Sequence, residues 1–251
     1  MAGYTDKGAV AEKNQDRVLM ADLVYKEQGH HAKADIPCVL AVCDGVGGYP
    51  GGEYAAEVSL QHLAKQTAAE MNSVERISEA LENVNENLIH LKKEIPAYSN
   101  MLTTIAGVVF TENKVFSFHA GDSRVYRLRG RYLSKVTKDH SIAQEMIDMG
   151  LIQENYDEIL AACSTITRCL GDRTYGLPHV QPLALHYLPG EIYMVCSDGI
   201  WSAISFDKLE SLLLTKGTLS EIADRIVKAA LEGGSKDNLS ICLGRVVIDE
   251  E

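Results

Sequence analysis

The chain has 251 residues, 46% of them hydrophobic, and no Pro/Ser-rich linker divides it, so we expect a single globular domain over residues 1–251. The formal net charge is −11 without a basic stripe, which argues against nucleic acid as the main ligand. No apolar stretch approaches the roughly 20 residues of a membrane span, and residues 1–15 lack a secretory signal, which predicts a cytoplasmic protein without a membrane partner.

The predicted elements rest on hydrophobic patterning. In chain order they are a strand over 37–43, helices over 53–64 and 77–91, strands over 102–110, 115–119, 125–128 and 192–196, a helix over 219–230 and a strand over 239–243. Thr218 or Ser220 can cap the last helix, which can end at Gly233-Gly234. The acidic segment 145–158 can form a helix with a mobile loop. Because strands come in groups with helices between them, we expect an α+β domain with mainly antiparallel sheet.

The six cysteines show no Cys-x-x-Cys spacing, which argues against a zinc ribbon or a thioredoxin-like site. Four of them lie in apolar runs. We therefore expect reduced thiols that pack as small hydrophobic side chains.

Five aspartates adjoin strand ends or sharp turns: Asp16, Asp44, Asp122, Asp198 and Asp237. Any single Asp-Gly pair is more often a turn than a binding site. Several carboxylates brought together would repel each other unless protons or cations neutralise them. Oxygen ligands of this kind suit hard ions such as Mg²⁺, Mn²⁺ or Ca²⁺.

The order of the motifs around these aspartates is more informative than any one of them. The segments 14–17, 42–48, 120–124, 197–201 and 235–238 resemble, in the same order, the motifs of the PPM (type 2C) metal-dependent serine/threonine protein phosphatases. Residues 103–104 and 166–171 match lesser motifs of that family. The spacings are similar to those of bacterial members, and the resemblance runs from about residue 3 to residue 247.

The resemblance implies a four-layer αββα sandwich of two mainly antiparallel sheets flanked by helices. It also implies two to three Mn²⁺ or Mg²⁺ ions per chain. Asp44 would bridge the first two ions and the Gly45 carbonyl would complete the first site. Asp198 and Asp237 would hold the second ion, and Asp16 would act through a water.

A weaker third ion would be held by Asp122 with Asp198, and residues near 145–165 would form the flap beside the active site. The implied reaction is hydrolysis of phosphoserine and phosphothreonine on proteins by a hydroxide that bridges two metal ions. The catalytic residues would be Asp44, Asp198, Asp237 and Asp16. Phosphorylated proteins would be the substrates, a cognate serine/threonine kinase pathway would supply them, and the chain would act as a monomer.

The sequence departs from the family at several positions. Ala11 stands where many relatives carry an arginine that binds the substrate phosphate, and Lys13 is in a different register, so we expect weaker substrate binding. Val46 stands where animal relatives have a histidine proposed as the acid for the leaving group, and Leu102 replaces a frequent glycine. His119 ends a predicted strand near the site, where a structural role is more usual than a metal ligand.

Two other functions remain open. Some relatives lose metal ligands and act as binding modules, but all five acidic positions are present here. A hydrolase for a small phosphate ester or nucleotide is the second alternative, although nothing in the sequence resembles a pocket for a base.

Overall fold

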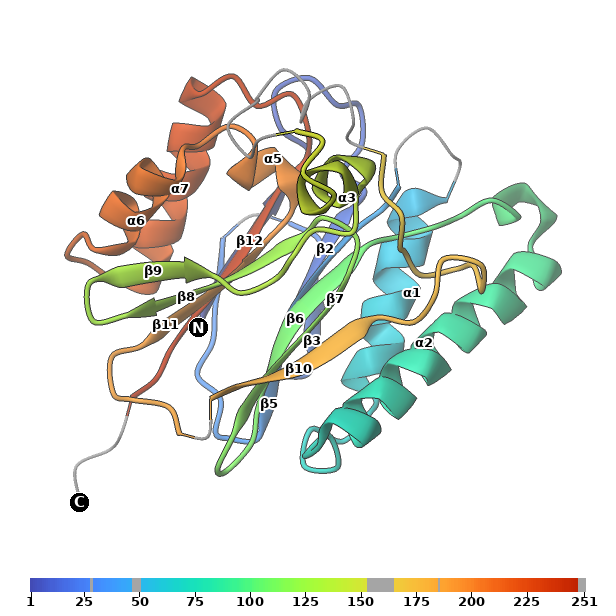
Figure 1. Cartoon of the computed structure of the whole chain (residues 1–251), viewed down its shortest axis with the longest axis horizontal. Coiled ribbons are helices and arrows are strands. Elements are labelled where there is room, and N and C mark those ends of the chain that lie inside the picture. Colours follow the sequence, from blue (N-terminus) through green and yellow to red (C-terminus); the bar gives the residue numbers. More distant parts are fainter. Residues whose placement is uncertain (28, 47–50, 153–164, 185, 248–251) are drawn as a thin grey trace.

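Two six-stranded sheets pack face to face in the computed structural model, which describes residues 1–27, 29–46, 51–152, 165–184 and 186–247 (Figure 1). The first sheet has the order β4 (His30–His31), β1 (Ala2–Asp6), β12 (Leu239–Arg245), β11 (Ile192–Cys196), β8 (Arg124–Arg129) and β9 (Tyr132–Lys135). The second has the order β10 (His179–Ala184), β7 (Val115–Ala120), β6 (Ile105–Phe110), β5 (Cys38–Asp44), β2 (Asp16–Met20) and β3 (Leu23–Tyr25). All of these pairings are antiparallel.

Three hydrophobic layers separate the sheets from each other and from the helices. Strand β5 shows how one strand contributes to two of these layers, because its side chains alternate between the two faces of the sheet. Leu40 and Val42 pack against the first sheet, where they meet Val195. Val39 and Ala41 point the other way, into the layer below the helices. A central strand buried on both faces therefore reads as a continuous apolar run.

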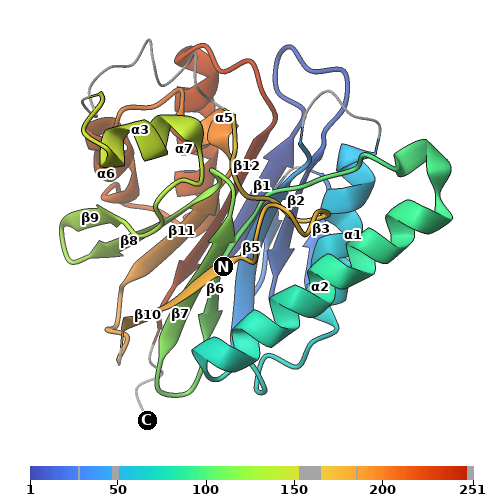
Figure 2. The same cartoon turned by 45° about the vertical axis from the view of Figure 1, so that its right-hand side comes forward.

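Helices cover the outer face of each sheet (Figure 2). On the second sheet lie α1 (Gly52–Ala64) and α2 (Val74–Glu94), followed by the short helix η1 (Pro96–Tyr98). The first sheet is covered by α5 (Asp198–Trp201), α6 (Phe206–Leu213) and α7 (Leu219–Glu232). A shorter helix, α3 (Ile142–Asp148), follows β9.

Helix ends follow local capping chemistry. The Ser73 hydroxyl accepts a hydrogen bond from the Arg76 amide at the start of α2. Thr218 and Glu221 form a reciprocal capping box at the start of α7, so Thr218 rather than Ser220 is the cap. After α7, Gly234 rather than Gly233 takes the positive φ, 86°.

The predicted fold class, an αββα sandwich of two antiparallel sheets, is confirmed, and all nine predicted elements are present with small shifts at their ends. The structure adds β1, β2, β3, β4, β9, β10, α5 and α6, which had not been predicted. The helix expected within 145–158 begins earlier, at Ile142, and ends at Asp148. Residues 153–164, most of the expected flap, lie outside the described residues. Within the described ranges, no helix is long and apolar enough to cross a membrane.

Candidate active site

The five aspartates lie at the ends of strands or in the segments next to them. Asp16 opens β2 and is the register partner of Asp44, which ends β5. Asp122 lies in the turn between β7 and β8, Asp198 follows β11, and Asp237 precedes β12. Four of them, all but Asp16, line a single cavity of about 610 Å³. The structure therefore brings together residues that are up to 221 positions apart, from 16 to 237.

Asp16 is fully buried and does not line the cavity. The Ser197 hydroxyl donates a 2.7 Å hydrogen bond to its Oδ2, while its Oδ1 is buried without a partner. Ser197 also accepts a 3.1 Å hydrogen bond from the backbone amide of Ser240, which fixes the hydroxyl. Burial raises the pKa of Asp16 to about 7, and the nearby carboxylates of Asp198 and Asp237 add to the increase.

Asp44 is held by its backbone. Its amide donates a 3.1 Å hydrogen bond to the Thr104 hydroxyl, and its carbonyl accepts a 2.8 Å hydrogen bond from the Thr103 hydroxyl. Gly45 follows directly, and a Cβ atom there would lie 2.4 Å from the carbonyl carbon of Gly52, so only glycine fits. Burial, followed by the charges of Asp16 and the other aspartates, raises the pKa of Asp44 well above its ordinary value.

Asp122 and Asp198 form the other side of the carboxylate cluster. Burial raises the pKa of Asp122 to about 8, with Asp198 adding to the increase. Burial also raises the pKa of Asp198 to about 6, with Asp237 adding to the increase. The indole of Trp201 donates a 2.9 Å hydrogen bond to the Asp122 carbonyl. The guanidinium of Arg124 stacks 3.3 Å from the centre of the Trp201 ring, so the turn that carries Asp122 is fixed.

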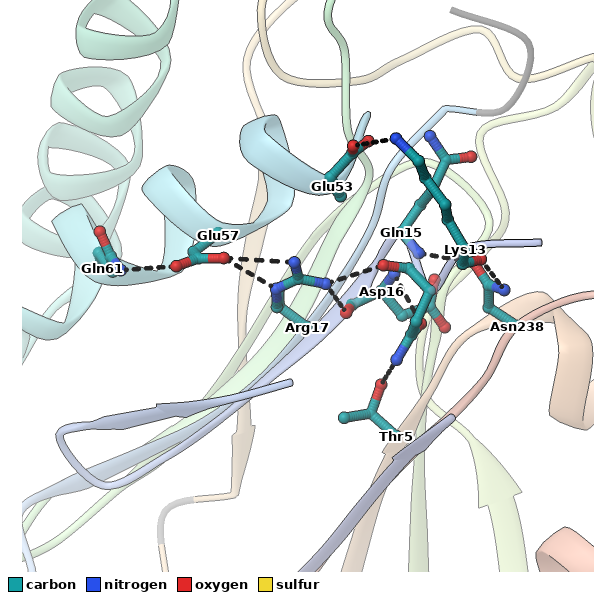
Figure 3. Close-up of polar contacts among 10 residues, drawn as sticks. Thr5, Lys13, Gln15, Asp16, Arg17, Glu53, Glu57, Gln61 and Asn238 are labelled. Carbon is teal, nitrogen blue, oxygen red and sulfur yellow. Dashed lines mark hydrogen bonds and ion pairs between the residues drawn. The ribbon is translucent and has the colours of Figure 1, made fainter. Parts of the chain in front are cut away.

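Asn238 joins the loop that carries Asp16 to the loop that carries Asp237 (Figure 3). Its side-chain oxygen accepts a 2.8 Å hydrogen bond from the Gln15 amide. Its side-chain nitrogen donates to the carbonyls of Lys7 and Lys13, both at 2.9 Å. The motif position of Asn238 was recognised in the sequence, but this connecting role was not.

The cationic side chains beside Asp16 form ion pairs with glutamates of helix α1 (Figure 3). Lys13 forms a 3.1 Å ion pair with Glu53 at the surface. Arg17 forms a 3.2 Å ion pair with Glu57. Ala11 lies on the same loop, half-buried. Among the described residues, no Lys, Arg or His side chain forms an ion pair with any of the five aspartates.

The carboxylate cluster fits divalent cations. Two buried carboxylate oxygens, Asp16 Oδ1 and Asp198 Oδ1, have no hydrogen-bond partner, and the pKa values of both aspartates are raised. Clustered carboxylates have these properties when no cation neutralises them. In the part of the chain that is described, no three His, Cys, Asp or Glu side chains already form a complete metal site. Mg²⁺ usually retains several water ligands and is coordinated by one or two carboxylates, so pairs of aspartates would provide a suitable set of protein ligands.

His119 supports the structural interpretation made from the sequence. Its ring is buried, its Nε2 lies 2.7 Å from the Lys138 carbonyl, and it stacks on His140 with ring centres 4.3 Å apart. Burial lowers its pKa to about 4. Val46 and Leu102, the two other departures from the family pattern, both line the cavity.

Comparison with known proteins agrees with this geometry. The sequence model described as Protein phosphatase 2C matches residues 12–227, most of the chain. The chain belongs to this family. The resemblance found in the motifs is thereby confirmed, and the protein is a metal-dependent serine/threonine protein phosphatase.

Relatives of this phosphatase are found in several bacteria. The serine/threonine phosphatase stp of Listeria monocytogenes is 26% identical over 245 residues, which cover 95% of this chain and 92% of the relative. PstP of Mycobacterium tuberculosis is 29% identical, and the match covers 98% of this chain but 45% of PstP.

Solved structures of PstP are also similar to this phosphatase. The crystal structure of the Mycobacterium tuberculosis serine/threonine phosphatase PstP/Ppp has a TM-score of 0.82 and 27% identity, with 99% of both chains covered. The PstP catalytic domain in complex with two manganese ions has a TM-score of 0.79 and 26% identity, covering 99% of this chain and 98% of that one.

Proposed function

We propose that the five aspartates are the metal-binding and catalytic residues of this phosphatase, which hydrolyses phosphoserine and phosphothreonine on proteins. One observation carries the proposal: four of these carboxylates line one cavity, the buried fifth feels the charges of Asp198 and Asp237, and none forms an ion pair with a described cationic side chain. Such an arrangement is stable at neutral pH only if cations or protons neutralise it.

We assign the ligands as follows. Asp44 contributes to two metal sites and the Gly45 carbonyl belongs to the first. Asp198 and Asp237 belong to the second, and the Asp44 and Asp198 carboxyl groups are within hydrogen-bonding reach of each other. Asp16, which does not line the cavity, would act through a water.

Asp122 with Asp198 would hold a third, weaker ion. Mn²⁺ and Mg²⁺ both suit these oxygen donors. The two manganese ions in the PstP complex support at least two sites. When bound, such ions would lower the pKa of a water and neutralise the phosphoryl oxygens for in-line attack.

Neighbouring side chains hold two of the five aspartates in position. Thr103 and Thr104 fix the Asp44 backbone, and Ser197 fixes the Asp16 carboxylate, so both are oriented before substrate binds. Val46 cannot transfer a proton at the position where animal relatives have histidine. We propose that a water protonates the leaving alcohol instead.

The test is hydrolysis of a phosphothreonine peptide with and without Mn²⁺. Asp44→Asn should lower kcat at least about 100-fold, since the neutral amide loses several kcal/mol of charge stabilisation. Asp22→Asn, an exposed aspartate before β3, is the matched control and should retain activity.

Two outcomes would contradict the proposal. Mn²⁺ binding in calorimetry without turnover would favour a binding module. Preferential hydrolysis of nucleotides over phosphopeptides would favour the small-molecule hydrolase.

We further propose that the protein is one domain over residues 1–251, acts as a monomer in the cytoplasm and opposes a cognate serine/threonine kinase. Five cysteines are free and buried: Cys38, Cys43, Cys169, Cys196 and Cys242. That state suits a reducing compartment. Light scattering of the purified chain would test the monomer, since a mass of twice 27.5 kDa would contradict it.

A further inference from the structure

The cavity reaches beyond the carboxylates to a second wall on the side of helix α2. Lys92, Asn100 and Tyr175 line this wall. A sphere of about 610 Å³ is about 10 Å across, which matches three extended residues rather than a phosphate group alone. The cavity therefore has room for residues on either side of a phosphorylated serine or threonine.

Lys92 is the only cationic side chain among the described residues that line the cavity. The chain carries a net charge of −11, and five of the other described lining residues are aspartates: Asp44, Asp122, Asp172, Asp198 and Asp237. A lysine placed there receives an anionic group more readily than any other lining residue can. Its position therefore needs an explanation in terms of substrate.

The ammonium group of Lys92 is held in place. It donates a 2.7 Å hydrogen bond to the Gly171 carbonyl. The Gly171 amide donates in turn to the buried side-chain oxygen of Asn85 at 2.7 Å. An ammonium has three donors, so two of them remain beyond the Gly171 contact.

The wall that holds Lys92 is connected directly to the metal-binding side. Leu170, next to Gly171, forms backbone hydrogen bonds with Thr103. Thr103 in turn donates its hydroxyl to the Asp44 carbonyl. The ammonium group and the catalytic carboxylates are therefore fixed in one rigid frame, as a recognition site requires.

A lysine near a helix C-terminus often does no more than complement the helix dipole. Lys93 meets that description, because it lies in the same last turn and is exposed. Lys92 differs because it is half-buried and faces the cavity. The neighbouring Asp172, which also lines the cavity, lies outside ion-pair distance of Lys92. Its Oδ1 accepts hydrogen bonds from the backbone amide and the hydroxyl of Thr174, at 2.8 and 2.7 Å. These bonds, with a smaller contribution from the charge of Lys92, lower the pKa of Asp172.

We propose that Lys92 binds the carboxylate of an aspartate or glutamate that lies within about three residues of the phosphorylated residue in the substrate. The enzyme then selects phosphoproteins with acidic sequence beside the phosphate. This inference rests on the proposed function and specifies its substrate class.

The test compares three substrates with Mn²⁺ present. Two are phosphothreonine peptides that differ only in having glutamate or glutamine beside the phosphothreonine, and the third is p-nitrophenyl phosphate. We expect the wild type to show a KM about three- to tenfold lower for the glutamate peptide. Lys92→Gln should abolish that preference while leaving kcat unchanged, because glutamine keeps a hydrogen-bond donor but not the charge.

Three controls separate charge from structure. Lys92→Arg should retain the preference, and Lys93→Gln should behave as the wild type. Hydrolysis of p-nitrophenyl phosphate, which lacks a flanking carboxylate, should have the same KM and kcat in every variant. Added salt should reduce the preference in the wild type.

A preference that survives in Lys92→Gln would overturn the inference. So would an equal rise in KM for all three substrates, which would place Lys92 at the scissile phosphate or make it a structural support. If the wild type hydrolysed none of them, the proposed function would fail separately. Calorimetry of the two peptides would then still measure the charge preference and decide on Lys92.

Discussion

At the scale of single residues, Ala11 is the main difference from the expected phosphate-binding pattern. It lies half-buried on the loop between β1 and β2. Lys13 does not replace the missing arginine, because Glu53 holds its ammonium at 3.1 Å at the surface. The phosphate therefore has no arginine fork on this loop, and binding depends on the metal ions and on other parts of the cavity.

We predict that Ala11→Arg lowers KM for a phosphothreonine peptide about tenfold with little change in kcat, because a guanidinium can bind the phosphate through two hydrogen bonds. Steady-state kinetics with Mn²⁺ measure both constants. Val10→Arg adds the same charge at the neighbouring position, which is 64% exposed, and serves as the control. An unchanged KM in Ala11→Arg, or an equal drop in Val10→Arg, would show that this position does not meet the phosphate.

The five aspartates were predicted from the sequence because motif order marks them, even though each one alone resembles a turn. Ser197 and Lys92 carry no comparable signal for the roles they have here. Both residues make contacts between segments that are distant in the sequence. Ser197 donates a hydrogen bond to a buried carboxylate, and Lys92 lines the cavity. Ser197 reaches across 181 positions to Asp16, and no local pattern records such a contact.

At the scale of elements, the strands that were predicted are those with long apolar runs, such as β5 and β11, whose residues are buried on both faces. Strand β10 was missed because it lies at the edge of its sheet, is partly exposed and contains a proline. Strand β2 was missed although all five of its residues are buried, because it begins with Asp16 and Arg17. Charged residues in a buried strand mark a functional position where sequence pattern and structure disagree.

The start of α5 and the residue before β12 approach each other so closely that only glycine fits at position 199. A Cβ atom at Gly199 would lie 2.0 Å from the Asn238 carbonyl oxygen. We predict that Gly199→Ala separates the Asp198 and Asp237 loops and lowers Mn²⁺ affinity about 10- to 100-fold, as the loss of supporting contacts at a metal site does. Calorimetric titration with Mn²⁺ measures the change, and an affinity equal to that of the wild type would show that the loops tolerate the wider spacing.

At the scale of the whole molecule, the carboxylate cluster links stability to pH and to metal. Without metal, the pKa values of Asp198, Asp16 and Asp122 are about 6, 7 and 8, against an ordinary 3.8. The folded protein therefore keeps protons that the unfolded chain has lost. The stability that these protons provide is complete below about pH 4, decreases as the pH rises above that value and is gone above about pH 8.

We predict that the Tm of the protein in EDTA falls between pH 6 and pH 8, and that saturating Mn²⁺ raises Tm more at pH 8 than at pH 6, because metal replaces protons that are already lost. Thermal unfolding at both pH values, with and without Mn²⁺, measures this. His119, with a pKa lowered to about 4, stays neutral over this range and does not contribute. A Tm in EDTA that is constant or rises with pH would refute the prediction.

The placement of β12 has a consequence for how the enzyme is made. This last strand lies inside the first sheet, between β1 and β11, and Asp237 directly precedes it. While the ribosome is synthesising the chain, β1 has no partner on its β12 side and the carboxylate cluster lacks Asp237. Proteins fold from the N-terminal side during translation, but this sheet waits for its final strand. We therefore expect a nascent chain to remain inactive until residues 239–245 have emerged from the ribosome and completed the sheet.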